Sequence, residues 1–186
     1  MDLFDAIRSR RSTKQFTDRA IAREEIERLL DAAAQAPNHR MTQPWRFYVL
    51  GPEARRAYGA VLGARKAKKV EDPEAARAVA EKVAAAEAAV PAAIAVSMTL
   101  DANPEIREED YAATMMGVQN LLLAARAMGL GTQLKTGAVM DDPGARAAVG
   151  VSDGERIVAL IQLGQPAAAP EAKPRRPAAD VTTWRS

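Results

Sequence analysis

The segment from Tyr111 to Met128 constrains the fold more than any other part of the sequence, because it is the longest weakly polar stretch. Its apolar residues, such as Leu121 and Leu122, recur at helical spacing but are not confined to one side. A helix that is apolar nearly all round has to be buried on several sides. We therefore predict that this segment is the central core helix or part of a subunit interface, and that its methionines fill gaps in the packing.

Shorter segments on either side predict an irregular succession of helices and strands. Apolar residues at helical spacing, or a Pro at the first position, predict helices over residues 3–9, 22–34, 52–62, 64–89 with a break at 71–74, and 141–149. Runs rich in β-branched, aromatic or continuous apolar residues predict strands over 45–50, 92–100, 132–136 and 157–164. Because helices separate the strands without regular alternation, we predict an α+β fold.

The length of 186 residues favours a single domain, which we expect to span residues 1–164. Hydrophobic residues make up 48% of the chain, which indicates a globular protein rather than a disordered one. From Gln165 onward the sequence turns to Pro, Ala and charged residues, which cannot form a core of their own. We therefore expect residues 165–186 to form a basic C-terminal tail that packs on the domain or on a partner subunit.

The charge balance and the lack of cysteine exclude several classes of function. Lys and Arg number 26 against 24 Asp and Glu, and the formal charge of +2 is too balanced for a protein that coats nucleic acid. With no Cys and a single histidine, His39, the sequence offers no thiolate catalyst, no disulfide and no multi-ligand Cys or His metal site. Asp2 and Asp5 interrupt the apolar start, and no run approaches the ~20 apolar residues of a membrane span. We expect a soluble, cytoplasmic protein without a membrane or nucleic-acid partner.

The stretch Arg10-Arg11-Ser12-Thr13-Lys14 places three cations and two hydroxyls in five positions directly after the first predicted helix. Arg forms paired hydrogen bonds to phosphate oxygens, Lys acts as a point charge, and Ser offers a hydroxyl suited to a polyol. Alternate residues of an extended segment face the same way, so Arg10, Ser12 and Lys14 can meet one ligand. The alternative is a basic helix end that interacts with the helix dipole, and this stretch alone favours neither.

A second polar stretch, residues 37–45, closes the second predicted helix and contains the sole histidine. His39 is either a ligand contact or a turn residue. The glycines that end the long helix fit neither the dinucleotide fingerprint nor the P-loop, although Lys135 and Thr136 beyond them can donate to an anion. The basic residues of the tail either add to such a site or remain solvated.

Four segments resemble, in order and spacing, the motifs of the FMN-dependent nitroreductase family. RRSTKQF is similar to the family's RRSxRxF opening, and APNHRMTQPWRFYVL is similar to its APSxxNxQPWRF segment. GVQNLLLAARAMGLGT is similar to its long central helix and Gly-ended turn, and GQPAAAPEAKPRRP to its closing G-x-P and basic tail. The Asn38-His39 pair and the short length resemble the compact NAD(P)H nitroreductase branch, whereas Met41 stands where the family usually has Asn.

The resemblance implies a nitroreductase-like α+β fold with a central mixed, mostly antiparallel sheet flanked by helices. It also implies an intertwined homodimer that binds FMN at the subunit interface. Arg10, Arg11 and Ser12 would hold the FMN phosphate and ribityl chain, and Lys14 would tune the charge of the flavin ring. The implied FMN contacts are Arg10, Arg11, Ser12, Lys14, Gln35, His39, Leu134, Lys135, Thr136, and Arg175 or Arg176. The implied NAD(P) contacts are Ala124, Ala125, Arg126, Ala127, Met128 and Gly129.

The activity implied by the resemblance is that of an FMN-dependent oxidoreductase. It would take hydride from NADH or NADPH and reduce nitroaromatic, quinone-like or other small acceptors by a ping-pong mechanism. No catalytic acid, base or nucleophile of the protein is obligatory, because the cofactor carries the chemistry. Two alternatives share the fold: a flavin enzyme with another reaction, such as dehalogenation or flavin breakdown, and a non-enzymatic flavin-binding module. A further alternative is an anion-binding α+β protein without a redox role.

Overall fold

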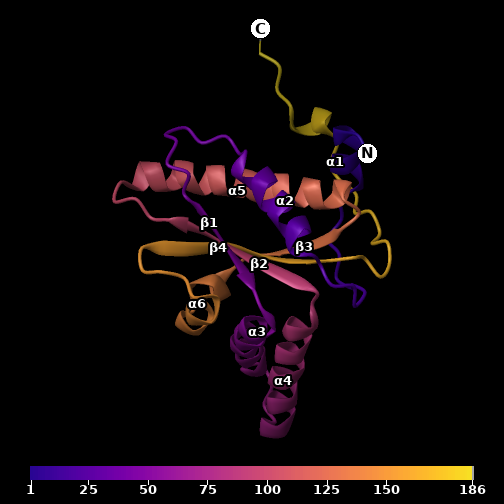
Figure 1. Cartoon of the computed structure of the whole chain (residues 1–186), viewed down its shortest axis with the longest axis vertical. Coiled ribbons are helices and arrows are strands. Elements are labelled where there is room, and N and C mark those ends of the chain that lie inside the picture. Colours follow the sequence, from indigo (N-terminus) through magenta and orange to yellow (C-terminus); the bar gives the residue numbers. More distant parts are fainter. Residues whose placement is uncertain (186) are drawn as a thin grey trace.

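A four-stranded antiparallel sheet runs through the middle of the computed structural model, which describes residues 1–185 (Figure 1). Its strands are β1 (Trp45–Leu50), β2 (Ala92–Thr99), β3 (Gly131–Lys135) and β4 (Glu155–Gly164), in the spatial order β1-β2-β4-β3. Neighbouring strands pair antiparallel. These bounds confirm, to within two residues at either end, the strands predicted from the sequence.

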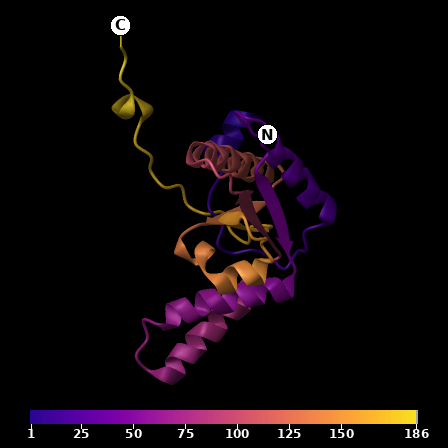
Figure 2. The same ribbon diagram turned by 90° about the vertical axis from the view of Figure 1, so that its left-hand side faces the viewer.

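Helices cover both faces of the sheet (Figure 1 and Figure 2). α2 (Arg23–Ala34) and α5 (Pro104–Ala127) lie over one face, while α3 (Pro52–Ala67), α4 (Pro73–Ala89) and α6 (Pro143–Val149) lie over the other. Because the central strands β2 and β4 are covered on both sides, nearly all of their side chains are buried. Their sequences are therefore continuous apolar runs rather than alternating ones. This arrangement confirms the α+β class.

Shorter elements flank these layers. α1 (Leu3–Ser9) lies beside the C-terminal end of α5, and 3₁₀ helices occur at Ala138–Asp141 and Ala178–Val181. After α1, Ser12 forms a parallel bridge with Thr132 of β3, and this bridge adds a parallel component to the sheet. Beyond β4 the tail leaves the body of the protein, as Figure 2 shows.

α5 is the core helix that its apolar sequence predicted. Val118, Leu121 and Leu122 are almost inaccessible and pack with β2 and β4 in the main hydrophobic core. Tyr111 and Met116 remain exposed at 41% and 42%, so one stripe of the helix faces solvent. Neither α5 nor any other helix within residues 1–185 combines the length and the apolarity needed to cross a membrane.

α5 begins at Pro104 rather than at Tyr111, so the predicted start of this helix was wrong. The Asn103 side chain caps it by accepting a hydrogen bond from the Glu105 N–H at 2.9 Å, and Pro104 occupies the first helical position. The first turns are polar and largely exposed, so apolar periodicity does not reveal them. The cap at Asn103 was the available signal.

α3 and α4 form a helical hairpin that extends away from the sheet (Figure 2). α3 continues to Ala67, beyond the end predicted near Leu62. The two helices approach closely at glycines: a Cβ on Gly63 would lie 2.5 Å from the Ala80 carbonyl oxygen. The hairpin therefore depends on the lack of a side chain at this position.

Gly63→Ala should destabilise the protein, although alanine is the better helix former. Alanine gains about 1 kcal/mol of helix propensity over glycine, but the new Cβ would meet the Ala80 backbone, which cannot rotate away. Overpacking of this kind costs about 1–3 kcal/mol, so we expect the free energy of unfolding from urea titration to fall by about 1 kcal/mol. The exposed neighbouring change Ala64→Gly measures the propensity effect alone. A Gly63→Ala protein as stable as the wild type would contradict the close contact.

Candidate functional site

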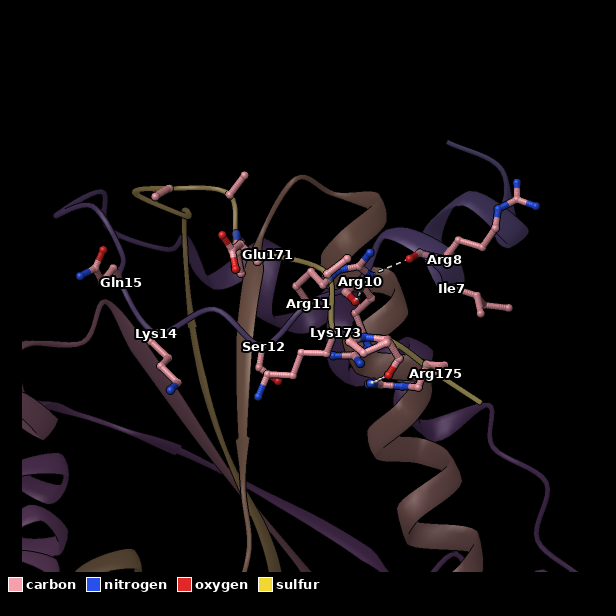
Figure 3. A pocket seen from close by; sticks show the side chains of 15 residues that line it. Ile7, Arg8, Arg10, Arg11, Ser12, Lys14, Gln15, Glu171, Lys173 and Arg175 are labelled. Atoms are coloured by element: carbon pink, nitrogen blue, oxygen red, sulfur yellow. Dashed lines mark hydrogen bonds between the residues drawn. The ribbon is translucent and has the colours of Figure 1, made fainter. Parts of the chain in front are cut away.

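A wide cavity of about 1120 Å³ opens between the end of α1, the extended segment that follows it and the C-terminal tail (Figure 3). Within residues 1–185, its lining holds six cationic side chains and a single carboxylate, that of Glu171. This imbalance favours an anionic ligand. The charged and polar lining residues are Arg8, Arg10, Arg11, Ser12, Lys14, Gln15, Glu171, Lys173 and Arg175.

The extended segment after α1 brings side chains to the cavity. Thr13 pairs with β3 and donates its N–H to the Thr132 carbonyl at 2.8 Å. The Thr13 side chain is buried against Gly131, where a Cβ would lie 2.5 Å from the threonine hydroxyl oxygen. Ser12 and Lys14 on either side of it line the cavity, and Arg11 and Gln15 line it as well, so of residues 10–15 only Thr13 is turned away.

Arg11 takes the helix-end role, one of the two that the sequence left open, whereas Arg10 does not. The Arg11 guanidinium donates to the carbonyl oxygens of Arg8 at 2.6 Å and Arg10 at 2.8 Å, so it caps the carboxyl end of α1. Arg10 and Lys14 form no ion pair with any group in the described chain, residues 1–185. Their charges are therefore available to a ligand.

The C-terminal tail forms the opposite wall of the cavity. Lys173 and Arg175 line it, and Figure 3 shows their side chains near Arg11 and Ser12. Arg176 is exposed and lies outside the lining. Of the two adjacent arginines predicted from the sequence, Arg175 is the one that the structure brings to the cations after α1.

The residues at the end of β3 point in different directions. Leu134 packs against the hydrophobic core beneath α5, and Lys135 forms an ion pair with Glu87 of α4 at 2.5 Å. Thr136 is exposed, and Gly137 follows with a φ of +116° that favours glycine as the chain leaves the sheet. The first two side chains are thus turned into the protein, while Thr136 lies at its surface.

Gln35 and His39 are exposed and do not line the cavity of the same chain. Arg40, next to His39, donates to Glu109 near the start of α5 at 2.7 Å. Arg126, at the other end of α5, is hydrogen-bonded to α1 beside the cavity. Residues 109 and 126 are about 25 Å apart along a helix that rises ~1.5 Å per residue. One chain therefore does not bring these two predicted contacts to the cation cluster.

The loop before β1 is held in a strained conformation. Met41 and Gln43 have positive φ angles of 51° and 46°, which is unusual for long side chains. The Asn38 side chain accepts a hydrogen bond from the Gln43 N–H at 2.7 Å, and Thr42 donates to the buried Asp110 at 2.5 Å. The Met41 side chain is left 70% exposed. Neither Met nor Gln signals a left-handed backbone, so the sequence did not reveal this loop.

The stretch Ala124 to Gly129, implied as an NAD(P) contact, lies partly in the core. Ala125 is fully buried, and Ala124 and Met128 pack against the main hydrophobic cluster. Arg126 donates to a hydroxyl of α1 at 2.9 Å. The NAD(P) contact stays a prediction.

Arg8, Gln15 and Glu171 line the cavity although the sequence did not single them out. Arg8 is the basic residue in the last turn of α1, so its place directly before the cationic stretch was a usable signal for it. Gln15 continues the extended segment, whereas Glu171 reaches the cavity through the course of the tail, which no local pattern specifies.

A family model and a sequence relative both indicate the same protein family. The model of the nitroreductase family matches residues 7–165. The protein of Bacillus subtilis (strain 168) named "Putative NAD(P)H nitroreductase YfhC" is 36% identical over 181 residues, which cover 97% of this chain and 93% of that protein.

Comparison with solved structures agrees. The crystal structure of the nitroreductase-like family protein from Bacillus cereus superposes with a TM-score of 0.86 and 31% identity, over 100% of this chain and 96% of that one. The structure described as "a putative nitroreductase in complex with fmn" from Desulfovibrio desulfuricans superposes with a TM-score of 0.74 and 25% identity, over 99% and 96% of the two chains.

Arg10→Ala and Arg11→Ala should separate ligand binding from helix capping. Loss of the Arg11 cap should lower the free energy of unfolding by about 0.3–1 kcal/mol. Loss of Arg10 should leave stability in dilute buffer unchanged but weaken the stabilisation by inorganic phosphate, because a ligand of the native state raises the Tm by mass action. Thermal unfolding with and without phosphate measures both effects. Arg176→Ala, outside the cavity, is the matched control, and an equal phosphate response in Arg10→Ala would contradict an anion site at Arg10.

Proposed function

This chain belongs to the nitroreductase family, and we propose that it is an FMN-dependent oxidoreductase that takes hydride from NADH or NADPH. The proposed acceptors are nitroaromatic, quinone-like or other small molecules, reduced by a ping-pong mechanism. The observation that carries this proposal is the cation-lined cavity, where Arg10, Lys14 and Arg175 come together. The name of the Bacillus subtilis relative and the FMN complex from Desulfovibrio desulfuricans support the reductant and the cofactor.

The residues around the cavity fit the phosphate end of FMN. A phosphate monoester carries about −1.5 to −2 charge near neutral pH, and Arg10 and Arg175 can each donate paired hydrogen bonds to it. The Ser12 hydroxyl can donate to or accept from a ribityl hydroxyl. The cavity volume of about 1120 Å³ leaves ample room, since small-molecule sites span about 300–1,000 Å³.

FMN, when bound, supplies the redox chemistry by accepting a hydride and passing it on. Lys14 would stabilise the negative charge that develops on the ring, because its ammonium has no carboxylate partner within residues 1–185. No side chain has to act as nucleophile or general acid, which suits a chain with no cysteine and one histidine. Reductant and acceptor would occupy the same face of the ring in turn, which is the physical basis of ping-pong turnover.

We also propose a homodimer in which two chains share each FMN site. His39 lies near the start of α5 and the cavity near its end, so a contact from His39 to the same ligand needs a second copy. Met116 on α5 is 42% exposed, and Trp184 and Val181 in the tail are 92% and 65% exposed. Such apolar groups favour a partner surface. We propose that the tail packs on that partner.

The purified protein should bind FMN and oxidise reduced nicotinamide. We expect a flavin absorption band that anaerobic NADH or NADPH bleaches and that a quinone or nitroaromatic acceptor then restores. Absorption spectroscopy of the FMN-loaded protein follows all three steps. Protein that takes up no FMN on reconstitution would contradict the proposal. Bound FMN that neither nucleotide bleaches would favour the non-enzymatic flavin-binding module.

Mixing two defective variants should restore part of the FMN binding. Arg10→Ala and His39→Ala are each expected to weaken binding, because they remove contacts to one ligand from different copies. After the variants are unfolded and refolded together, a mixed dimer has one site with both residues intact, and random pairing leaves about a quarter of all sites intact.

FMN titration by fluorescence measures the recovered fraction. Each variant refolded alone is the control and should recover nothing. If the mixture binds no more FMN than the separate variants, although light scattering shows dimers, the shared site is refuted.

A further inference from the structure

A buried carboxylate joins the helical hairpin to the edge strand of the sheet. Glu87, near the end of α4, is 7% exposed. Its Oε1 lies 2.5 Å from the Lys135 ammonium at the end of β3, and its Oε2 accepts a hydrogen bond from the Gln162 amide of β4 at 2.8 Å. Both carboxylate oxygens are therefore engaged, on the face of the sheet opposite α5.

Stability alone explains this cluster poorly. Taking an ion pair out of water costs several kcal/mol, roughly as much as the attraction between the charges returns. The surrounding face is otherwise apolar, with Tyr58, Ala93 and Leu160 in its core. Apolar residues in place of Glu87 and Lys135 would serve the core at least as well. The charges therefore point to a role in setting position.

The position of β3 matters because the segment that lines the candidate site is paired with this strand. Ser12 is bridged to Thr132 in parallel register, and Thr13 donates its N–H to the Thr132 carbonyl, so the segment after α1 is held against this strand. Lys135 is the last residue of that strand. A group that holds the end of β3 thus also sets where the cations after α1 lie.

Close packing fixes Glu87 from the side of α3. A Cβ on Gly59 would lie 2.7 Å from the Glu87 Cβ, so the two helices press together at this residue. Tyr58, adjacent in α3, is 1% exposed, and its burial, followed by the charge of Glu87, raises its pKa to about 12. The negative charge of Glu87 therefore acts on the neighbouring Tyr58 hydroxyl.

On the premise that FMN binds as proposed above, we propose that Glu87 is a positioning residue of the flavin site. By pairing with Lys135, it keeps that ammonium on the α3–α4 face of the sheet and cancels its charge. Lys14, which lines the cavity and forms no ion pair within residues 1–185, then keeps its charge. The two lysines have separate roles: Lys14 faces the ligand cavity, and Lys135 anchors the strand.

The test compares Glu87→Gln and Lys135→Met with Glu81→Gln, which makes the same change at an exposed site of α4. In FMN-loaded protein, the flavin midpoint potential should rise in Glu87→Gln, because an unneutralised Lys135 stabilises the reduced, negatively charged ring. It should fall in Lys135→Met, because the carboxylate is left without its cation. The double variant Glu87→Gln/Lys135→Met should return toward the wild-type potential.

Amide hydrogen exchange of the FMN-free protein is the second readout. Peptides that span residues 131–137 should exchange about tenfold faster in Glu87→Gln than in Glu81→Gln, which corresponds to about 1.4 kcal/mol of local opening. This measurement needs no cofactor and reports whether Glu87 holds the end of β3.

Opposite shifts in potential that cancel in the double variant would support the positioning role. Unchanged potentials, or shifts of the same sign in both single variants, would overturn it even if thermal stability falls. Wild-type protein that binds no FMN would instead refute the proposed function. In that case unchanged exchange over residues 131–137 would also overturn the anchoring role of Glu87.

Discussion

The close contact between Thr13 and Gly131 is the constraint on which the candidate site depends. A Cβ at position 131 would lie 2.5 Å from the threonine hydroxyl oxygen, so any side chain there would push the segment after α1 off the edge strand. The same segment holds the start of the tail, because the Gln15 carbonyl accepts the Ala167 N–H at 3.0 Å. The end of α1, the edge of the sheet and the tail therefore meet at one cavity, although they are far apart in the sequence.

The partners of the basic residues separate structural charges from those available to a ligand. Lys135 is matched by Glu87, and Arg40 by Glu109, so both cations are neutralised within the fold. Arg10 has no carboxylate partner in the described part of the chain, residues 1–185, and it lies among other cations in the cavity. This concentration of positive charge attracts an anion, which is why a phosphate-bearing ligand fits the cavity.

Local patterns predicted most of the fold and the cation half of the site. Strands and helices followed from periodicity, and Arg10, Ser12 and Lys14 share a cavity as their place in one extended segment predicted, although Arg11 and Gln15 line it too. What local patterns could not predict are contacts between distant residues. The pairing of Lys135 with Glu87 joins positions 48 residues apart, and no periodicity or motif specifies which face of the sheet a lysine at the end of an edge strand will choose.

The strained loop before β1 lies near the start of α5, whereas the cations after α1 lie near its end. A left-handed backbone costs roughly 1–2 kcal/mol for a residue other than glycine, and the loop holds Met41 and Gln43 in this conformation. Asn adopts such a backbone more readily than Met or Gln. Strain of this size persists only where the surroundings enforce it, here through the Asn38 side chain and contacts with α5. The loop holds His39 away from the cavity of its own chain. In the proposed homodimer, the same conformation would place His39 at the cavity of the second copy.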